Sequence, residues 1–270
     1  MALWLPLALP LWWLLRDDSN LSTIVTMGAL AVGFLCLIPV WGRRVYRQPR
    51  MFARYGLSWD RGNAIALLQG LGIGLVFVFG LFATMGSLGW VTFQPNSHWP
   101  RVVVEGALSA SAIAFGEEIF FRGWLLDELE RDYSPTTALW IDAIVFAILH
   151  FLKPIEEAIR TFPQFPGLTI LGLALVWAKR SRCNRLGIAI GLHGGLVWGY
   201  YLLNVGQLVE YNTVVSPWVT GVDGNPIAGV VGILGLSLLA VWMRWQNPSS
   251  RARRDRLHRS DSRTDLKSKN

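Results

Sequence analysis

The sequence predicts an all-α fold, a polytopic bundle of membrane helices with an active-site cavity inside the membrane. Hydrophobic residues make up 52% of the 270 residues, and charged residues make up only 16%. A soluble domain carries roughly 25% charged residues, spread along its length. Several stretches approach or exceed the ~20 apolar residues that a helix needs to cross ~30 Å of hydrocarbon. Many of the charges lie in the tail after Met243, so the preceding chain is even more apolar.

Seven apolar stretches are predicted to be membrane spans. They run over residues 21–41, 64–90, 102–126, 135–153, 165–179, 186–203 and 227–245. Residues 1–15 are also apolar, but Pro6 and Pro10 interrupt them. They lack the basic start and the small-residue cleavage site of a signal peptide. We therefore expect a short, uncleaved first helix in addition to the seven spans.

The distribution of Lys and Arg predicts the orientation of the spans. Basic residues gather in the connection 42–63, in the C-terminal tail and in the loop after the fifth span, which carries Lys179, Arg180, Arg182 and Arg185. The connection 204–226 contains no Lys or Arg. Because cytoplasmic loops are enriched in basic residues, alternation through seven spans puts all three basic segments in the cytoplasm and the connection 204–226 outside. The expected host is the plasma membrane, with a thylakoid or organellar membrane as the alternative.

The net charge of +7 does not indicate nucleic-acid binding, because basic residues directly follow the last apolar segment. These residues are Arg251, Arg253, Arg254, Arg256, Arg259, Arg263, Lys267 and Lys269. In that position they mark a cytoplasmic face and attract anionic lipid headgroups. A tail that binds another macromolecule is the alternative. The tail itself is nearly free of large apolar groups and is predicted to be disordered.

Glycines recur at the spacing of closely packed helices. Gly70 pairs with Gly74 and Gly191 pairs with Gly195, in two different predicted spans. Small residues let helix backbones approach one another in lipid. Much of the glycine content is therefore expected to serve helix packing.

Two adjacent glutamates and an arginine, Glu117-Glu118-Ile-Phe-Phe-Arg122, interrupt the third apolar stretch. An ionised side chain in a bilayer costs on the order of 3 kcal/mol, so such groups pair or line a wet cavity. Glu118 and Arg122 are four residues apart and can form an ion pair on one helix face. Glu117 lies about 100° around the helix and remains free to act on water.

His150 and His193 also lie in apolar stretches, whereas His98 and His258 do not and are assigned no role. Near a neutral imidazole, Glu117 could take a proton from water, and a second histidine could stabilise an oxyanion. Alternatively, Glu117, His150 and His193 could hold Zn²⁺ and leave one position for water. A third possibility is purely structural, an ion-paired helix with two packing histidines.

Asp142 precedes His150 by eight residues and falls near the same helix face. It is expected either to hydrogen-bond within the bundle and orient the site, or to lie at the helix entry near cytoplasmic water.

The order of these motifs resembles the CPBP family of intramembrane proteases, which includes the type II CAAX prenyl endopeptidases and bacterial relatives linked to bacteriocins. The motifs are Glu-Glu-x-x-x-Arg, then Phe-x-x-x-His, then a later intramembrane His, over roughly residues 102–203. The resemblance implies that Glu117 activates water, that His150 is its partner, and that His193 belongs to the oxyanion site or a metal shell. The cofactor is then either zinc or none.

The resemblance also implies a division of the chain. Residues 1–101 would form N-terminal membrane helices, residues 102–245 the protease core with the last helix, and residues 246–270 a disordered basic cytoplasmic tail.

One position departs from the family pattern, which usually has Asn or Asp four residues after the last His. Here the residue is Val197, which can neither donate a hydrogen bond nor bind a metal. Loss of one oxyanion donor reduces turnover on the order of 10²–10³-fold. Either a neighbour such as Trp198 or Tyr200 substitutes for it, or the enzyme is slow, or activity is lost.

The sequence thus predicts an intramembrane endopeptidase that hydrolyses a peptide bond of a membrane-associated or lipidated peptide or protein with Glu-activated water. The alternative is a catalytically weak or inactive scaffold of the same fold. A transporter would use Glu117 and His150 in a proton relay, but the sequence lacks a matched pair of interrupted helices in two halves.

Overall fold

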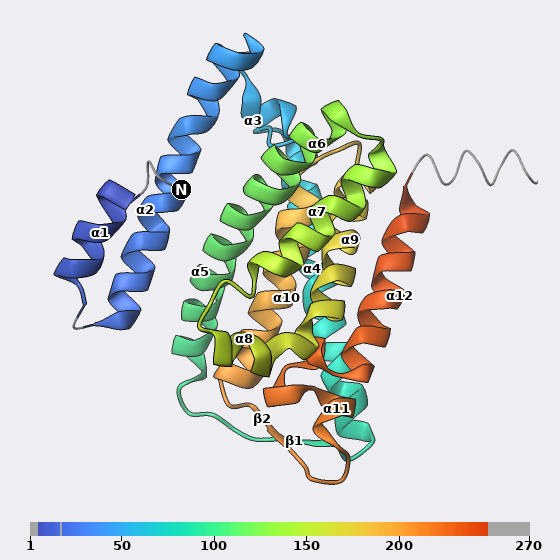
Figure 1. Cartoon of the computed structure of the whole chain (residues 1–270). Helices are drawn as coiled ribbons and strands as arrows, with labels where there is room; N and C mark the ends of the chain where they lie inside the picture. Colours follow the sequence, from blue (N-terminus) through green and yellow to red (C-terminus); the bar gives the residue numbers. More distant parts are fainter. Residues whose placement is uncertain (1–4, 17, 248–270) are drawn as a thin grey trace, which may run out of the picture. The chain divides into compact units, whose positions relative to one another are not determined.

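The computed structural model describes residues 5–16 and 18–247, and these residues are almost entirely helical (Figure 1). The chain forms two compact units that meet between Arg54 and Tyr55. The helix at 61–87 belongs to the second unit because it packs against the helix at 187–200. The division into N-terminal helices and a protease core at residues 101 and 102 stays a prediction.

The first unit contains three helices. They are α1 (Leu5–Leu14), α2 (Ser19–Trp41), which continues as a π-helical segment (Gly42–Tyr46), and α3 (Met51–Arg54). Asp18 begins α2, because its carboxylate accepts a hydrogen bond from the Leu21 N–H at 2.9 Å. The expected first helix is therefore present over Leu5–Leu14, and residues 1–4 of the predicted range lie outside the described residues.

The second unit contains the remaining helices, which run up and down between two ends (Figure 1). They are α4 (Arg61–Ser87), α5 (Trp99–Glu118), α6 (Leu126–Asp132), α7 (Pro135–Leu149), α8 (Ile155–Thr161), α9 (Phe165–Ser181), α10 (Gly187–Tyr200), α11 (Pro217–Thr220) and α12 (Val230–Gln246). A π-helical segment (Ile119–Leu125) joins α5 to α6, and another (Tyr201–Val205) extends α10. Short 3₁₀ turns lie at Phe162–Gln164, Val222–Gly224 and Pro226–Ala228.

Four helices of the described residues are long and apolar enough to cross a membrane. They are Val25–Tyr46, Arg61–Ser87, Ile155–Ser181 and Gly187–Val205, which correspond to four of the predicted spans. The predicted spans 135–153 and 227–245 correspond to α7 and α12, which are apolar but have only 15 and 17 residues. The predicted span 102–126 corresponds to α5, which is not among the four. The membrane fold is present, but a count of seven spans is not confirmed.

Glycines bring α4 and α10 into backbone contact. A Cβ atom at Gly191 would lie 1.9 Å from the Leu67 carbonyl oxygen, and one at Gly74 would lie 2.5 Å from the Leu192 carbonyl oxygen. The expected use of glycine for close packing is confirmed for this helix pair. Because α10 also carries His193, the contact fixes the position of that side chain.

Gly191→Ala is expected to destabilise the protein by about 1–3 kcal/mol, because the added methyl group overpacks the contact between α4 and α10. Gly72→Ala is the matched control on α4, since a Cβ there meets no atom within 4 Å. It should be neutral or stabilising by up to about 1 kcal/mol, because alanine is the better helix former. Thermal unfolding of the purified variants in detergent measures both effects, and equal midpoints would contradict the packing argument.

A two-stranded ribbon closes one end of the second unit. β1 (Val91–Phe93) pairs antiparallel with β2 (Val209–Tyr211), with Thr92 opposite Glu210. Beside it, the Gly224 carbonyl accepts hydrogen bonds from Asn204 and from the Tyr211 hydroxyl, each at 2.7 Å. Burial raises the pKa of the Tyr211 phenol. The sequence analysis treated these strands as plain connections.

Ion pairs join the loops at the opposite end. Arg185 lies 3.8 Å from Asp60 before α4, and Arg180 lies 2.6 Å from Glu130 on α6. The basic connection between α9 and α10 is thus separated from the connection 204–226 by the length of the bundle, as the predicted orientation requires (Figure 1). α9 extends to Ser181, so Lys179 and Arg180 lie in the helix, not in the loop predicted for them.

Candidate active site

The acidic motif lies where α5 changes from α-helical to π-helical geometry. Glu118 is the last residue of α5, and Arg122 lies within the π-helical segment Ile119–Leu125. Short π-helical insertions are rare and are frequent at functional sites. The predicted span 102–126 is therefore interrupted at its most polar point.

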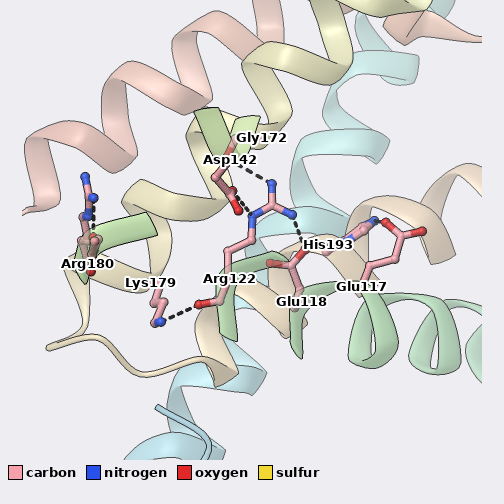
Figure 2. Close-up of polar contacts among 9 residues, drawn as sticks. Glu117, Glu118, Arg122, Asp142, Gly172, Lys179, Arg180 and His193 are labelled. Atoms are coloured by element: carbon pink, nitrogen blue, oxygen red, sulfur yellow. Dashed lines mark hydrogen bonds and ion pairs between the residues drawn. The ribbon is translucent and has the colours of Figure 1, made fainter. Parts of the chain in front are cut away.

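Arg122 is the centre of a buried ionic cluster (Figure 2). Its Nη1 donates to Glu118 Oε1 at 3.0 Å, and the side chains of both residues are 0% exposed. This is the ion pair that the sequence predicts. The structure adds Asp142, whose Oδ2 lies 3.4 Å from Arg122 Nε. Arg122 Nη2 also donates to the Gly172 carbonyl at 3.2 Å. The buried Arg122 cation thus offsets part of the charge of two buried carboxylates, and a charge in a low-dielectric interior requires such a partner.

Of the two positions expected for Asp142, the one inside the bundle is observed. Its side chain is 0% exposed and faces Arg122, so it is not a helix-entry carboxylate in contact with water. The close approach of α7 and α9 makes this arrangement possible. A Cβ atom at Gly172 would lie 2.8 Å from Ala143 Cα, so only glycine brings the Gly172 carbonyl within reach of Arg122.

Phe146, the aromatic residue of the Phe-x-x-x-His motif, packs among the polar groups. Its ring centre lies 4.3 Å from the Arg122 guanidinium carbon, 4.6 Å from the His150 ring centre and 6.1 Å from that of His193. A cation over an aromatic face is attracted by the ring quadrupole. Phe146 therefore holds the ionic cluster and both imidazoles in one packed group.

The two histidines have their tautomers fixed by acceptors. His193 Nδ1 lies 2.8 Å from Glu118 Oε1, and His150 Nδ1 lies 2.7 Å from the Phe146 carbonyl oxygen. The Glu118 carboxylate and the Phe146 carbonyl can only accept hydrogen bonds, so the Nδ1 atom of each histidine donates its hydrogen. In the neutral imidazoles both Nε2 atoms then carry lone pairs.

His150 does not lie inside a helix, as the sequence analysis expected, but directly follows the last residue of α7. The predicted span continued to residue 153, whereas α7 ends at Leu149. After Leu149 the backbone tightens, and the N–H groups of His150, Phe151 and Leu152 each donate to the carbonyl three residues back.

The three predicted catalytic side chains converge. Glu117 Oε2 lies 4.0 Å from His150 Nε2 and 4.0 Å from His193 Nε2. These distances are too long for direct hydrogen bonds and suit a bridging O–H donor such as water. Glu117 and His150 are about one-third exposed, at 33% and 32%, while His193 is 5% exposed. The group can therefore be reached from the side of Glu117 and His150.

The donor geometry gives no support to the zinc alternative. Among residues 5–16 and 18–247, no group of three or more His, Cys, Asp and Glu side chains is arranged to hold a metal ion.

Comparison with known families identifies this region. Residues 99–199 match the family described as type II CAAX prenyl endopeptidase Rce1-like. This part of the chain is similar to that family. The matched range contains every predicted site residue, and the resemblance to the CAAX and CPBP proteases is confirmed. Comparisons with curated proteins and with solved structures gave no match.

The match to the Rce1-like family supports a membrane peptidase. Together with the four helices long enough to cross a membrane, it identifies an integral membrane protein.

Val197, the departure in the Rce1-like segment, lies beside an apolar cavity. The cavity has a volume of about 130 Å³ and is lined by His193, Val197 and Tyr200 from α10 together with side chains of α4, α9 and α12. Trp198 does not replace the missing donor, because its indole N–H donates to the Val103 carbonyl at 3.1 Å. Tyr200 faces the cavity, with its hydroxyl 3.5 Å from the Gly224 carbonyl. The valine therefore extends an apolar wall.

The sequence analysis missed Lys179 as part of the site. Its Nζ donates to the Arg122 carbonyl at 2.5 Å, and the residue is 6% exposed. Lysine in the last turn of an apolar helix is typical of an interfacial anchor. The sequence pattern therefore did not predict that Lys179 donates to a buried carbonyl. Only the fold brings the π-helical segment and the end of α9 together.

Proposed function

We propose that the protein is an intramembrane endopeptidase that hydrolyses a peptide bond of a membrane-associated or lipidated peptide or protein. The observation that carries this proposal is the convergence of Glu117 Oε2 with the Nε2 atoms of His150 and His193 at 4.0 Å. The convergence lies within the segment that matches the Rce1-like family. A prenylated C-terminus is the substrate that the family description suggests, and a small membrane peptide is the alternative.

In the proposed reaction, Glu117 is the general base. A water molecule beside Glu117 Oε2 gives up a proton to the carboxylate as its oxygen attacks the scissile carbonyl carbon. The His150 lone pair orients that water by accepting its second hydrogen. The protonated Glu117 then delivers its proton to the leaving amine, so the carboxylate is regenerated.

His193 stabilises the oxyanion only when its Nε2 carries a proton. Its Nδ1 hydrogen is held by Glu118, so the neutral ring offers the oxyanion a lone pair. The imidazolium form would donate from Nε2, and the Glu118 carboxylate at 2.8 Å would stabilise the added charge. Arg122 and Asp142 serve this step indirectly, because they position Glu118.

The length of α7 supports a site within the membrane. Fifteen residues rise about 22 Å, which is less than the ~30 Å of a bilayer core. If α7 starts at the cytoplasmic surface, His150 lies below the far interface. We propose that α5, α7 and α12 complete seven crossings of the plasma membrane, with the basic tail in the cytoplasm and bound to anionic lipids.

The experiment that tests the proposal compares the wild type with His150→Asn on membrane-anchored fluorogenic peptides in reconstituted bilayers. The shorter asparagine side chain places no acceptor at the position of Nε2, so the cleavage rate should fall by about 10²-fold or more. Cleavage that is equal in both proteins would contradict the assignment. If neither protein cleaves the peptides but both still bind them, the result would favour the alternative, a catalytically weak or inactive scaffold, which Val197 motivates.

A chelator provides the companion measurement. Because the reaction is derived without a metal ion, we expect a strong zinc chelator to leave the rate unchanged. Inhibition that added Zn²⁺ reverses would assign Glu117, His150 and His193 as metal ligands instead.

A further inference from the structure

A second polar cleft lies away from the catalytic group, at the end of the bundle that carries the basic connection between α9 and α10. It has a volume of about 670 Å³ and is bounded by the end of α6, the start of α7 and the ends of α9 and α12. In Figure 1 α9 lies between α7 and α12, and its Trp177 lines the cleft. Trp140 of α7 lines it from the neighbouring helix. None of the catalytic side chains contributes to the cleft.

The described side chains that line the cleft carry a net positive charge. Among them the charged groups are Arg180, Arg244 and Glu130, so two cations and one anion leave one positive charge. The Arg180 guanidinium already has protein partners, because it donates to Glu130 at 2.6 Å and to the Pro135 carbonyl at 2.7 Å.

Arg244 differs from Arg180 in its contacts. Its guanidinium carbon lies 5.6 Å from the Trp177 ring centre, and within the described part of the chain it has no ion pair. Stacking on an aromatic face orients a guanidinium while leaving its N–H donors available. Asn184 adds a side-chain amide to the same cleft.

Both flanking helices carry a strip of exposed apolar side chains. The strips include Trp140, Ile144 and Ile148 on α7, and Leu234, Leu238, Val241 and Trp245 on α12. Their spacings of three and four residues place each set on one helix face. Trp140 also lines the cleft, and Arg244 lies roughly 90° around α12 from the middle of its strip. A ligand with a polar head at Arg244 would therefore have an apolar strip on each flanking helix beside it.

We propose that this cleft binds one anionic phospholipid. Arg244 would donate to the phosphate, Asn184 would donate to the phosphate or its polar substituent, and the acyl chains would lie along the strips on α7 and α12. Three features favour a lipid of the bilayer: the net charge of the described lining side chains, the tryptophans that line the cleft and the exposed apolar strips on the two flanking helices. The site is independent of the proposed peptidase reaction.

Native mass spectrometry of the detergent-purified full chain tests the proposal, with equal amounts of phosphatidylglycerol and phosphatidylcholine added. We expect the wild type to retain one phosphatidylglycerol in preference to phosphatidylcholine. Arg244→Ala should weaken phosphatidylglycerol binding about fivefold, which corresponds to about 1 kcal/mol for one basic contact. Arg61→Ala is the matched control, because Arg61 is exposed at the same end and does not line the cleft.

Three results would overturn the proposal: equal retention of the two lipids, an equal effect of Arg61→Ala, or displacement of the lipid by millimolar inorganic phosphate. The last result would indicate a site for a soluble anion. Arg244→Lys supplies a further check, because it retains the charge and loses the stacking on Trp177. We expect its binding to be intermediate, and binding no better than that of Arg244→Ala would also speak against the headgroup assignment.

Discussion

Glu117→Gln is expected to reduce peptide-bond hydrolysis by about 10²–10⁴-fold, the range that a general base contributes. The amide cannot accept the proton of the attacking water, although it has nearly the same shape as the carboxylate. Folding should be unaffected, because Glu117 is 33% exposed and lies outside the ion pairs around Arg122. Initial rates of membrane-peptide cleavage, measured beside the thermal unfolding midpoint, separate the two effects.

Glu105→Gln is the control for this substitution. Glu105 lies on the same helix and pairs at 2.6 Å with Arg101, whose side chain is 76% exposed. Its replacement removes one carboxylate of α5 without touching the histidines, so cleavage should continue at the wild-type rate. If Glu117→Gln cleaves as fast as Glu105→Gln, Glu117 is not the base.

Arg122→Met is expected to lower the free energy of unfolding by about 3–5 kcal/mol, the cost of removing one partner from a buried ion pair. The substitution leaves Glu118 and Asp142, both 0% exposed, without their common cation. The thermal unfolding of the purified protein in detergent gives the size of the effect. His193 loses the fixed position of its Glu118 acceptor, so cleavage should fall even where the variant is folded.

Two further variants make this prediction specific. Arg131→Met removes an arginine that is 47% exposed and lies 3.7 Å from Glu128, so it should cost about 1 kcal/mol or less. Combining Arg122→Met with Glu118→Gln and Asp142→Asn removes the buried anions together with the cation. This triple variant should recover part of the lost stability without recovering activity. A triple variant less stable than Arg122→Met alone would show that charge compensation is not the reason for the cluster.

Contacts between residues close in the sequence were predictable, and those between distant helices were not. The pairing of Glu118 with Arg122 follows from their spacing of four residues. The glycine spacings in α4 and α10 likewise predicted close packing, which the contact of Gly191 with Leu67 confirms. Hydropathy, however, does not encode how each helix is rotated about its axis. For that reason the sequence left the position of Asp142 open and did not predict that Lys179 reaches the Arg122 carbonyl.

Element boundaries were the least predictable feature. A hydropathy window continues through apolar residues after a helix has ended, so it placed His150 inside a span when it directly follows α7. The π-helical segment at Ile119–Leu125 has no compositional signal, because its residues suit an α-helix equally well. Strands of three residues, such as β1 and β2, are too short to show an alternating pattern.

The glycine contact between α4 and α10 has a consequence for how a substrate arrives. Because the backbones of α4 and α10 are in contact, an extended peptide cannot pass between these two helices from the lipid into the bundle. The carboxylate and imidazole that remain accessible are those of Glu117 on α5 and of His150, directly after α7. A polypeptide chain that arrives on the side of these two residues would bring its scissile bond to Glu117 before it met His193.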